Sequence, residues 1–337
     1  MKKKRNAQIL CLLLLVLSLV CSSCSTKEPE ANPNESGSEV VGAEKTVQIL
    51  DWTGHEENFS ACPKRVVAVS GSLGEVWLNA GGTLIGTTQD AITERNLDLP
   101  EETAMIGTIK EPDLEVILSL EPDFVILSAD IISHQDLAKS LQEMGIPYGL
   151  FHEEYFQDYL TLLEQFTSLT GRTDLYESNG LEVERDIQQT LAQTQSLEDK
   201  TVLLLRAYSS GFKAKNSENL TGTMLKDFGL QNILDVYDSI LEEISMEEIL
   251  RVDPDYIFVT VMGSDTQAGI DYLESQLCED PAWSTLTAVK EGNYHVLPKD
   301  LFHYKPNARW NEAYAYLAQR LDGSEMQIDG LASEPDT

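Results

Sequence analysis

One short sequence pattern occurs twice in this chain, and it constrains the fold more than any other feature. The first copy, LEVILSLEPDFVIL, spans 114–127, and the second, MEEILRVDPDYIFV, spans 246–259. The copies align without a gap, so that Glu115 matches Glu247. Residues at helical spacing before each Pro-Asp pair predict a short helix, and the apolar run after it predicts a buried strand. Two copies predict two equivalent α/β lobes that face each other across a cleft.

Apolar, strand-like runs alternate with segments of helical periodicity through the rest of the chain. Near-continuous apolar strands between helices are typical of parallel sheets that are covered on both faces. The sequence therefore predicts an α/β fold of two Rossmann-like lobes joined by a long α-helix, with the ligand cleft between the lobes. The predicted strands include RVVAVS (65–70), LIGTT (84–88), IPYGLF (146–151), KTVLLLRAYS (200–209) and GNYHVLP (292–298).

The segment between the two halves has the pattern of a connecting helix. Residues 173–198 are polar with a narrow apolar stripe, which suits a helix that lies across two lobes. Thr173 is the expected N-cap, and Gly180 weakens the helix by up to about 1 kcal/mol relative to alanine. The predicted order is a signal peptide at 1–23, a flexible tether at 24–45, an N-terminal lobe at 46–172, the linker helix at 173–198, a C-terminal lobe at 199–322 and a disordered tail at 323–337.

The N-terminus has the features of an export signal. A basic start precedes the apolar stretch 9–20, and small residues then lead to Cys24. This pattern resembles a bacterial lipobox, which implies that Cys24 carries a lipid and anchors the exported chain to the outer face of the cell membrane. An ordinary cleaved signal is the alternative. The polar segment 24–45 then serves as the tether.

The charge of the chain excludes several kinds of partner. The sequence contains 24 Lys and Arg against 56 Asp and Glu, which gives a formal net charge of −32. Such a surface is repelled by nucleic acid and by anionic lipid, so neither is an expected partner. After the signal only Cys62 and Cys278 remain, in opposite halves, and we expect both thiols to be free. We also expect a monomer.

The duplicated glutamates have two possible roles. Glu115 and Glu247 lie in the first turn of their predicted helices, where a carboxylate stabilises the helix by about 0.3–1 kcal/mol. Ser245 and Glu248 form a capping-box pattern, which satisfies the second helix without Glu247. The residues alone leave open whether the two glutamates stabilise their helices or bind a partner.

Taken together, the export signal, PKRVVAVSGSLGEVWLNAGG, the two E-x-I-L-x-x-x-P-D units and the bridging helix resemble the class III solute-binding proteins. These are receptors of ABC importers for ferric siderophores, haem and cobalamin, and the resemblance covers roughly residues 46–322. It implies that a ligand binds between the lobes. It also implies that Glu115 and Glu247 dock onto the membrane permease subunits, which couple to a cytoplasmic ATPase.

Ligand-binding residues follow from a rule of α/β sheets. Ligands meet the loops beyond the carboxyl ends of the strands. Basic and aromatic residues gather in two such loops, RAYSSGFKAKN (206–216) and LFHYKPNARWNEAY (301–314), where they suit anionic groups and flat or ring-rich ligands. The candidate ligand residues are Ser70, Ser72, Lys110, Arg206, Tyr208, Lys213, Lys215, Met262, His303, Tyr304 and Arg309, and Ile109 and Asp130 also follow strands.

Several ligands fit these residues. The basic residues favour an anionic ferric siderophore as the small-molecule iron chelate. Haem is the alternative, with His303 or Tyr304 as a possible iron ligand. Cobalamin fits less well, because its amide-rich corrin gains less from cations.

Other classes of function have little support in the sequence. No catalytic motif is recognised, so we expect no enzyme, and a cleft hydrolase is only a remote alternative. No cofactor is expected. A receptor for a bare metal ion needs several converging ligands, which five scattered histidines do not supply.

Overall fold

The computed structural model describes residues 46–237 and 242–322, which belong to one compact unit. The predicted signal peptide, Cys24, the tether and the C-terminal tail lie outside the described residues. Two separate parallel sheets organise the chain, one in each half. The predicted α/β fold is therefore confirmed, while the predicted boundaries of lobes and linker stay predictions. No helix in the described ranges is long and apolar enough to span a membrane.

The N-terminal half is built on a five-stranded parallel sheet with the order β5-β4-β3-β6-β7. A small antiparallel hairpin of β1 and β2 precedes it. Its elements are β1 (Val47–Leu50), β2 (Glu56–Phe59), β3 (Val66–Ala68), α1 (Gly71–Asn79), β4 (Gly86–Thr87), α2 (Asp90–Thr93), β5 (Ala104–Met105), α3 (Leu114–Ser119), β6 (Phe124–Ser128), α4 (Ile132–Met144), β7 (Tyr148–Phe151) and α5 (Phe156–Thr170).

The C-terminal half is built on a second sheet with the order β10-β8-β11-β12, and β9 pairs with β8 in antiparallel fashion. Its elements are β8 (Thr201–Tyr208), β9 (Gly211–Lys215), α8 (Leu220–Asp227), β10 (Gln231–Asn232), α9 (Ile233–Val236), α10 (Met246–Val252), β11 (Tyr256–Val261), α11 (Thr266–Leu273), α12 (Thr287–Lys290), β12 (Tyr294–Val296), α13 (Lys299–Phe302) and α14 (Trp310–Asp322). Short π- or 3-10-helical turns cover Glu274–Cys278, Trp283–Thr285 and Asn307–Arg309.

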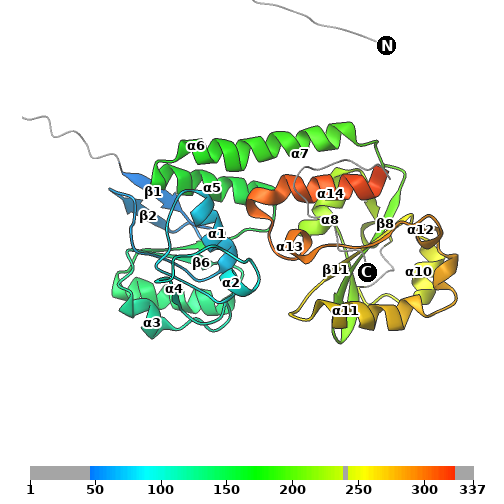
Figure 1. Ribbon diagram of the computed structural model, residues 1–337, viewed down its shortest axis with the longest axis horizontal. Helices are drawn as coiled ribbons and strands as arrows, with labels where there is room; N and C mark the ends of the chain where they lie inside the picture. Colours follow the sequence, from blue (N-terminus) through cyan, green and yellow to red (C-terminus); the bar gives the residue numbers. More distant parts are fainter. Residues whose placement is uncertain (1–45, 238–241, 323–337) are drawn as a thin grey trace, which may run out of the picture. The chain divides into compact units, whose positions relative to one another are not determined.

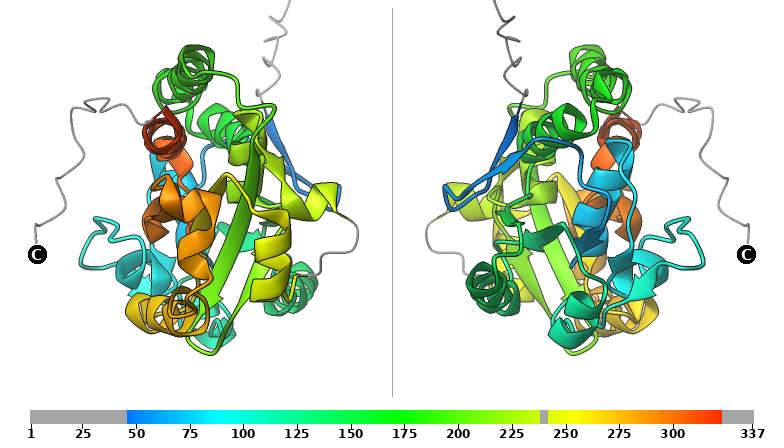
Figure 2. Two further views of the ribbon diagram at one scale, coloured as in Figure 1. Left: turned by 90° about the vertical axis from the view of Figure 1, so that its right-hand side faces the viewer. Right: turned by 90° about the vertical axis from the view of Figure 1, so that its left-hand side faces the viewer.

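Helices cover both faces of the sheets, as the views along the molecule show (Figure 2). The strands β6 and β11 are fully buried, which explains their unbroken apolar sequences. One hydrophobic cluster contains buried residues of both halves, including Trp77 and Phe124 from the first and Phe258 and Trp310 from the second. The two halves therefore share part of one core.

The two copies of the duplicated segment occupy corresponding places, one in each sheet. The first forms α3 and β6, and the second forms α10 and β11 (Figure 1). Glu121 and Asp253, at matching positions after the helices, both have positive φ, of 46° and 43°. This left-handed residue and the proline that follows it end each helix.

The aspartate of each Pro-Asp pair connects the copy to the first strand of its sheet. Asp123 accepts hydrogen bonds from the backbone N–H groups of Lys64 and Arg65 at 2.8 Å. Asp255 accepts one from the backbone N–H of Thr201 at 2.9 Å. The duplicated aspartates thus hold the starts of β3 and β8 beside the central strands.

The connecting segment forms α6 (Thr173–Tyr176), a π-helical turn (Glu177–Leu181) and α7 (Glu182–Gln193). Figure 1 shows α6 beside α5 of the first half and α7 beside α14 of the second, in agreement with their contacts. The prediction that Thr173 is the N-cap is wrong. The backbone of Arg172 is not helical, so Arg172 is the N-cap and Thr173 is the first helical residue.

Gly180 lies in the π-helical turn because the neighbouring helix leaves no room for a side chain. Gly180 is buried, and a Cβ there would lie 2.8 Å from Leu160 Cδ1 and 3.1 Å from Leu163 Cδ2 of α5. Close packing of α5 against the linker therefore offsets the low helix propensity of glycine.

Candidate functional site

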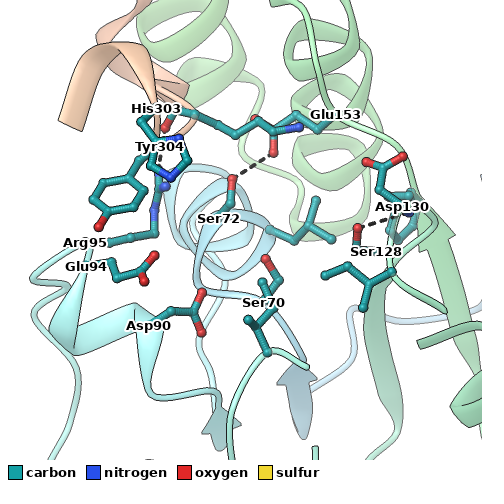
Figure 3. Close-up of a pocket in the computed structure, with 15 residues that line it drawn as sticks. Ser70, Ser72, Asp90, Glu94, Arg95, Ser128, Asp130, Glu153, His303 and Tyr304 are labelled. Atoms are coloured by element: carbon teal, nitrogen blue, oxygen red, sulfur yellow. Dashed lines mark hydrogen bonds between the residues drawn. The ribbon is translucent and has the colours of Figure 1, made fainter. Parts of the chain in front are cut away.

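A pocket lies where the first sheet reverses its strand order. From β3 the strand order runs to β4 and β5 on one side and to β6 and β7 on the other. Ligands bind at such a reversal, so the crevice at the carboxyl ends of β3 and β6 is the expected ligand position. A pocket of about 220 Å³ occupies this place (Figure 3). Its lining comprises Ser70, Ser72, Leu73, Asp90, Glu94, Arg95, Ile109, Ser128, Asp130, Ile131, Phe151, Glu153, His303, Tyr304 and Lys305.

Both halves of the chain contribute to this pocket. Ser70 and Ser72 come from the end of β3 and the start of α1, whereas His303, Tyr304 and Lys305 come from the turn after α13. The structure thus brings together four residues of the predicted set, namely Ser70, Ser72, His303 and Tyr304. The strand-end positions Ile109 and Asp130 line the same pocket.

The other predicted ligand residues do not line this pocket, and three of them have carboxylate partners. Arg309 Nη1 lies 2.9 Å from Asp300 Oδ2, and its Nε donates to Glu312 at 2.8 Å. Lys215 Nζ lies 2.8 Å from Glu242 Oε1, and Lys213 Nζ lies 3.5 Å from Glu243 Oε1. The remaining members are Lys110, Arg206, Tyr208 and Met262, of which Lys110 and Met262 are exposed.

Arg206 differs from the paired cations. It lies opposite Lys213 in the pairing of β8 and β9, and its Nε is buried with no hydrogen bond to any described residue. The charge of Arg206 nevertheless acts on His303, which lines the pocket. Burial first, and then the charges of Lys299 and Arg206, lower the pKa of His303 to about 4. His303 is therefore neutral at physiological pH.

Sequence reasoning missed four charged residues that the N-terminal half contributes to the lining, namely Asp90, Glu94, Arg95 and Glu153. Asp90 follows β4 and Glu153 follows β7. The rule that selected Ser70 and Asp130 would have found both positions if it had been applied to every predicted strand, since each is the second residue after LIGTT or IPYGLF.

Burial and neighbouring carboxylates perturb two of these acids. Glu153 is 3% exposed, and its Oε2 accepts a hydrogen bond from Ser72 Oγ at 2.9 Å. Burial raises the pKa of Glu153, while the charges of Lys305 and Arg95 oppose this shift. Burial and the adjacent Asp90 also raise the pKa of Glu94.

A polar network joins the two halves beside the pocket. Arg95 forms an ion pair with Glu75 and donates to the backbone oxygen of Lys305 at 2.6 Å. Asn307 Nδ2 donates to the backbone oxygen of Ser72 at 3.1 Å and to Glu75 Oε2 at 2.8 Å. Residues of α1 and of the turn after α2 are thereby fixed to the segment between α13 and α14.

A bare metal ion has no evident ligand set here. Among the residues that the structure describes, no three or more His, Cys, Asp or Glu side chains are grouped to hold a metal. Cys62 and Cys278 form no disulfide within this part of the chain.

The duplicated glutamates are exposed and are not needed to cap their helices. Asp113 accepts hydrogen bonds from the backbone N–H groups of the first turn of α3, and Ser245 with Glu248 forms the capping box of α10. The carboxylates of Glu115 and Glu247 have no hydrogen bond or ion pair to the described residues. Both therefore remain available on the surface.

Comparisons with known proteins agree with this architecture. The family model described as periplasmic binding protein matches residues 66–301. The chain is 26% identical over 293 residues to the Fe(3+)-citrate-binding protein YfmC of Bacillus subtilis, covering 85% of this chain and 88% of the relative. It is 22% identical over 239 residues to the high-affinity heme uptake system protein IsdE of Staphylococcus aureus, covering 68% and 77%.

A solved structure shows the same fold. The iron uptake ABC transporter substrate-binding protein PiuA from Streptococcus pneumoniae superposes with a TM-score of 0.65 at 20% identity, over 81% of this chain and 96% of that one. The family match covers most of the chain and both sheets. The chain therefore belongs to the periplasmic binding protein family, whose members bind solutes and are not enzymes.

Proposed function

We propose that this chain is the extracytoplasmic solute-binding component of an ABC importer and captures a ferric siderophore. The observation that carries the proposal is the pocket at the reversal of strand order, lined by residues of both halves. A pocket of this kind suits a receptor that encloses its ligand between two lobes. The Fe(3+)-citrate-binding relative supports an iron chelate as the ligand.

Delivery requires contact with the membrane permease. We assign this contact to Glu115 and Glu247, which are exposed, unpaired within the described chain and matched between the two sheets. Two equivalent carboxylates fit a permease that presents a cation at each docking point. The cytoplasmic ATPase is then an indirect partner.

Membrane attachment is proposed through Cys24. A lipid on this residue and the following polar tether keep the receptor near its permease. Cys24→Ser is expected to release the exported protein from the membrane fraction, which immunoblotting of fractionated cells measures. Retention of the variant in the membrane would contradict the proposal.

Ligand titration tests the function directly. Trp52 is 66% exposed and its ring lies 4.5 Å from that of His152, whose Nδ1 lies 2.6 Å from Asp130 Oδ1 in the pocket wall. Ligand binding is therefore expected to change the fluorescence of Trp52. The mature chain is titrated with ferric siderophores, ferric citrate, haemin and cobalamin. Saturable binding of a ferric siderophore supports the proposal, and saturable binding of cobalamin alone would overturn it.

Haem is the second candidate, because His303 lines the pocket and is neutral at physiological pH. A neutral imidazole nitrogen is a suitable haem ligand, and Tyr304 beside it is another. If haem is the ligand, haemin gives a shifted Soret band that His303→Ala or Tyr304→Phe alters. A Soret band that is the same in both variants would remove these side chains as iron ligands.

A further inference from the structure

Carboxyl groups dominate the wall of the pocket that the first half supplies. The four residues are Asp90, Glu94, Asp130 and Glu153 (Figure 3). Asp90 Oδ2 accepts a hydrogen bond from the backbone N–H of Gly71 at 2.8 Å, but its Oδ1 is buried and receives none from the described residues. The Oε1 atom of the buried Glu153 likewise has no donor in these ranges. Buried oxygens without donors favour a ligand that supplies N–H or O–H groups.

The two cations of the pocket are already neutralised by other carboxylates. Arg95 pairs with Glu75, which does not line this pocket. Lys305 Nζ lies 3.1 Å from Glu154 Oε2, and Glu154 is also outside the lining. His303 is neutral at physiological pH. Asp90 and Glu94 therefore line the pocket without an ion pair to any described residue, while Arg95 and Lys305 are each paired with a carboxylate outside the lining.

The size of the pocket limits what can enter it. Sites that bury a drug-sized ligand usually measure about 300–1,000 Å³, whereas this pocket measures about 220 Å³. It has room for an arm of a ferric chelate rather than for the whole chelate. Arg206 acts on His303 from outside the lining and forms no ion pair with the described residues, so its guanidinium can bind the anionic oxygens of the iron-bearing part of the chelate.

We propose that this pocket is a subsite for a cationic arm of the chelate, an ammonium group that pairs with Asp90 and Glu94 and donates to Glu153 Oε1 while the iron-bearing part of the chelate lies outside the pocket. This inference rests on the proposed function, since it specifies the charge of the same ligand. It selects an amine-bearing ferric chelate over a polycarboxylate such as ferric citrate. Opposite charges inside a partly buried site attract far more strongly than in water.

A series of probes with one iron centre and different arms isolates this effect. The probes are ferric complexes of one linear trishydroxamate whose terminal amine is free, acetylated or succinylated, so that the arm is cationic, neutral or anionic. The full mature chain is titrated with each by tryptophan fluorescence and by calorimetry. The free amine is expected to bind at least about tenfold more tightly than the acetylated form, which corresponds to about 1.4 kcal/mol. The succinylated form is expected to bind most weakly.

Variants locate the preference in the pocket. Asp90→Asn and Glu94→Gln remove charge with little change of shape. Each is expected to reduce severalfold the ratio of the affinity for the free amine to the affinity for the acetylated form. Glu143→Gln is the matched control, because Glu143 is exposed on α4. It lies about 16 Å along that helix from Ile132, which follows the lining residue Ile131. The control is expected to retain the wild-type ratio. Thermal unfolding of each variant checks that the fold is intact.

Four outcomes would overturn the inference, and the first three concern the relative affinities of the probes. These are equal affinity for the three probes, a preference for the succinylated form, and a preference that Asp90→Asn and Glu94→Gln both leave unchanged. Absence of binding by all three probes also overturns it. The separate titrations with other siderophores, ferric citrate and haemin then decide whether the chain binds an iron chelate at all, so the two proposals fail independently.

Discussion

At the residue scale, Glu153 is the most constrained ionisable group of the site. It is nearly inaccessible, accepts one hydrogen bond from Ser72 and has one oxygen without a donor among the described residues. Because burial raises its pKa, the folded state holds a proton that the unfolded state releases at lower pH. Stability that depends on this proton is present at low pH and is lost as pH rises from the unfolded pKa through the raised folded pKa.

Glu153→Gln is therefore expected to make stability less dependent on pH. As pH rises above the usual glutamate pKa, the wild type should lose stability relative to the variant, because the unfolded wild-type chain releases the proton of Glu153 at lower pH than the folded state does. Urea unfolding at several pH values measures the difference. Parallel curves for the two proteins would show that Glu153 ionises in the folded state as it does in the unfolded chain.

Arg206 supports a second prediction at this scale. Arg206→Ala is expected to weaken binding of the ferric chelate by about 1.5–3 kcal/mol, the usual value of a buried hydrogen bond to a charged group. Arg172→Ala is the control, because Arg172 is exposed, does not line the pocket and forms its ion pair with Asp174, two residues away. Titration of both variants gives the dissociation constants. A constant that is unchanged in Arg206→Ala would remove this residue from the site.

At the element scale, the linker shows how packing overrides local propensity. The π-helical turn Glu177–Leu181 interrupts α6 and α7 and places Gly180 against Leu160 and Leu163 of α5. Intrinsic propensity alone favours alanine over glycine in a helix by about 1 kcal/mol. A Cβ at this position instead overlaps the ends of two leucine side chains, which have to move.

Gly180→Ala is thus expected to destabilise the protein by roughly 1–3 kcal/mol, because overpacking outweighs the gain in propensity. Gly211→Ala is the matched control, since nothing lies within 4 Å of a Cβ there and the backbone has no positive φ. Urea unfolding compares both variants with the wild type. A more stable Gly180→Ala would mean that the two helices separate without cost.

At the scale of the whole molecule, the two halves carry matching helices, α3 and α10, and share part of one hydrophobic core. Glu115 on α3 and Glu247 on α10 are exposed at corresponding positions, and neither lines the ligand pocket. Their substitution should therefore separate delivery from capture.

Charge reversal of both, Glu115→Lys with Glu247→Lys, is expected to abolish uptake of the iron chelate in cells, because two cations would face the docking cations of the permease. Affinity for the ligand in solution should be unchanged. Glu143→Lys on α4 is the control and should retain uptake. Uptake of labelled iron and titration of the purified variants measure the two effects. A large loss of affinity in solution would instead place these glutamates in ligand binding or folding.

Much of the fold could be predicted from local sequence, whereas the site could be predicted only in part. The sequence predicts Ser70 and Asp130 because each lies at or just beyond the end of an apolar strand. The sequence also predicts Lys215 as a ligand residue, since nothing local reveals that Glu242, 27 residues further along the chain, lies 2.8 Å from it. Its pairing depends on the register of β8 with β9 and on the path of the chain after β10.

The sequence by itself determined the two α/β halves, their buried strands and the Pro-Asp turns, because apolar periodicity and the backbone limits of proline act within a few residues. Only the tertiary structure decided the charge of the pocket. The order of the strands places the ends of β4 and β7 on either side of β3 and β6, so that Asp90 and Glu153 line one pocket, to which the other half contributes His303. Whether these residues line one pocket depends on the order of the strands and on how the halves pack. Neither can be predicted from a local sequence pattern.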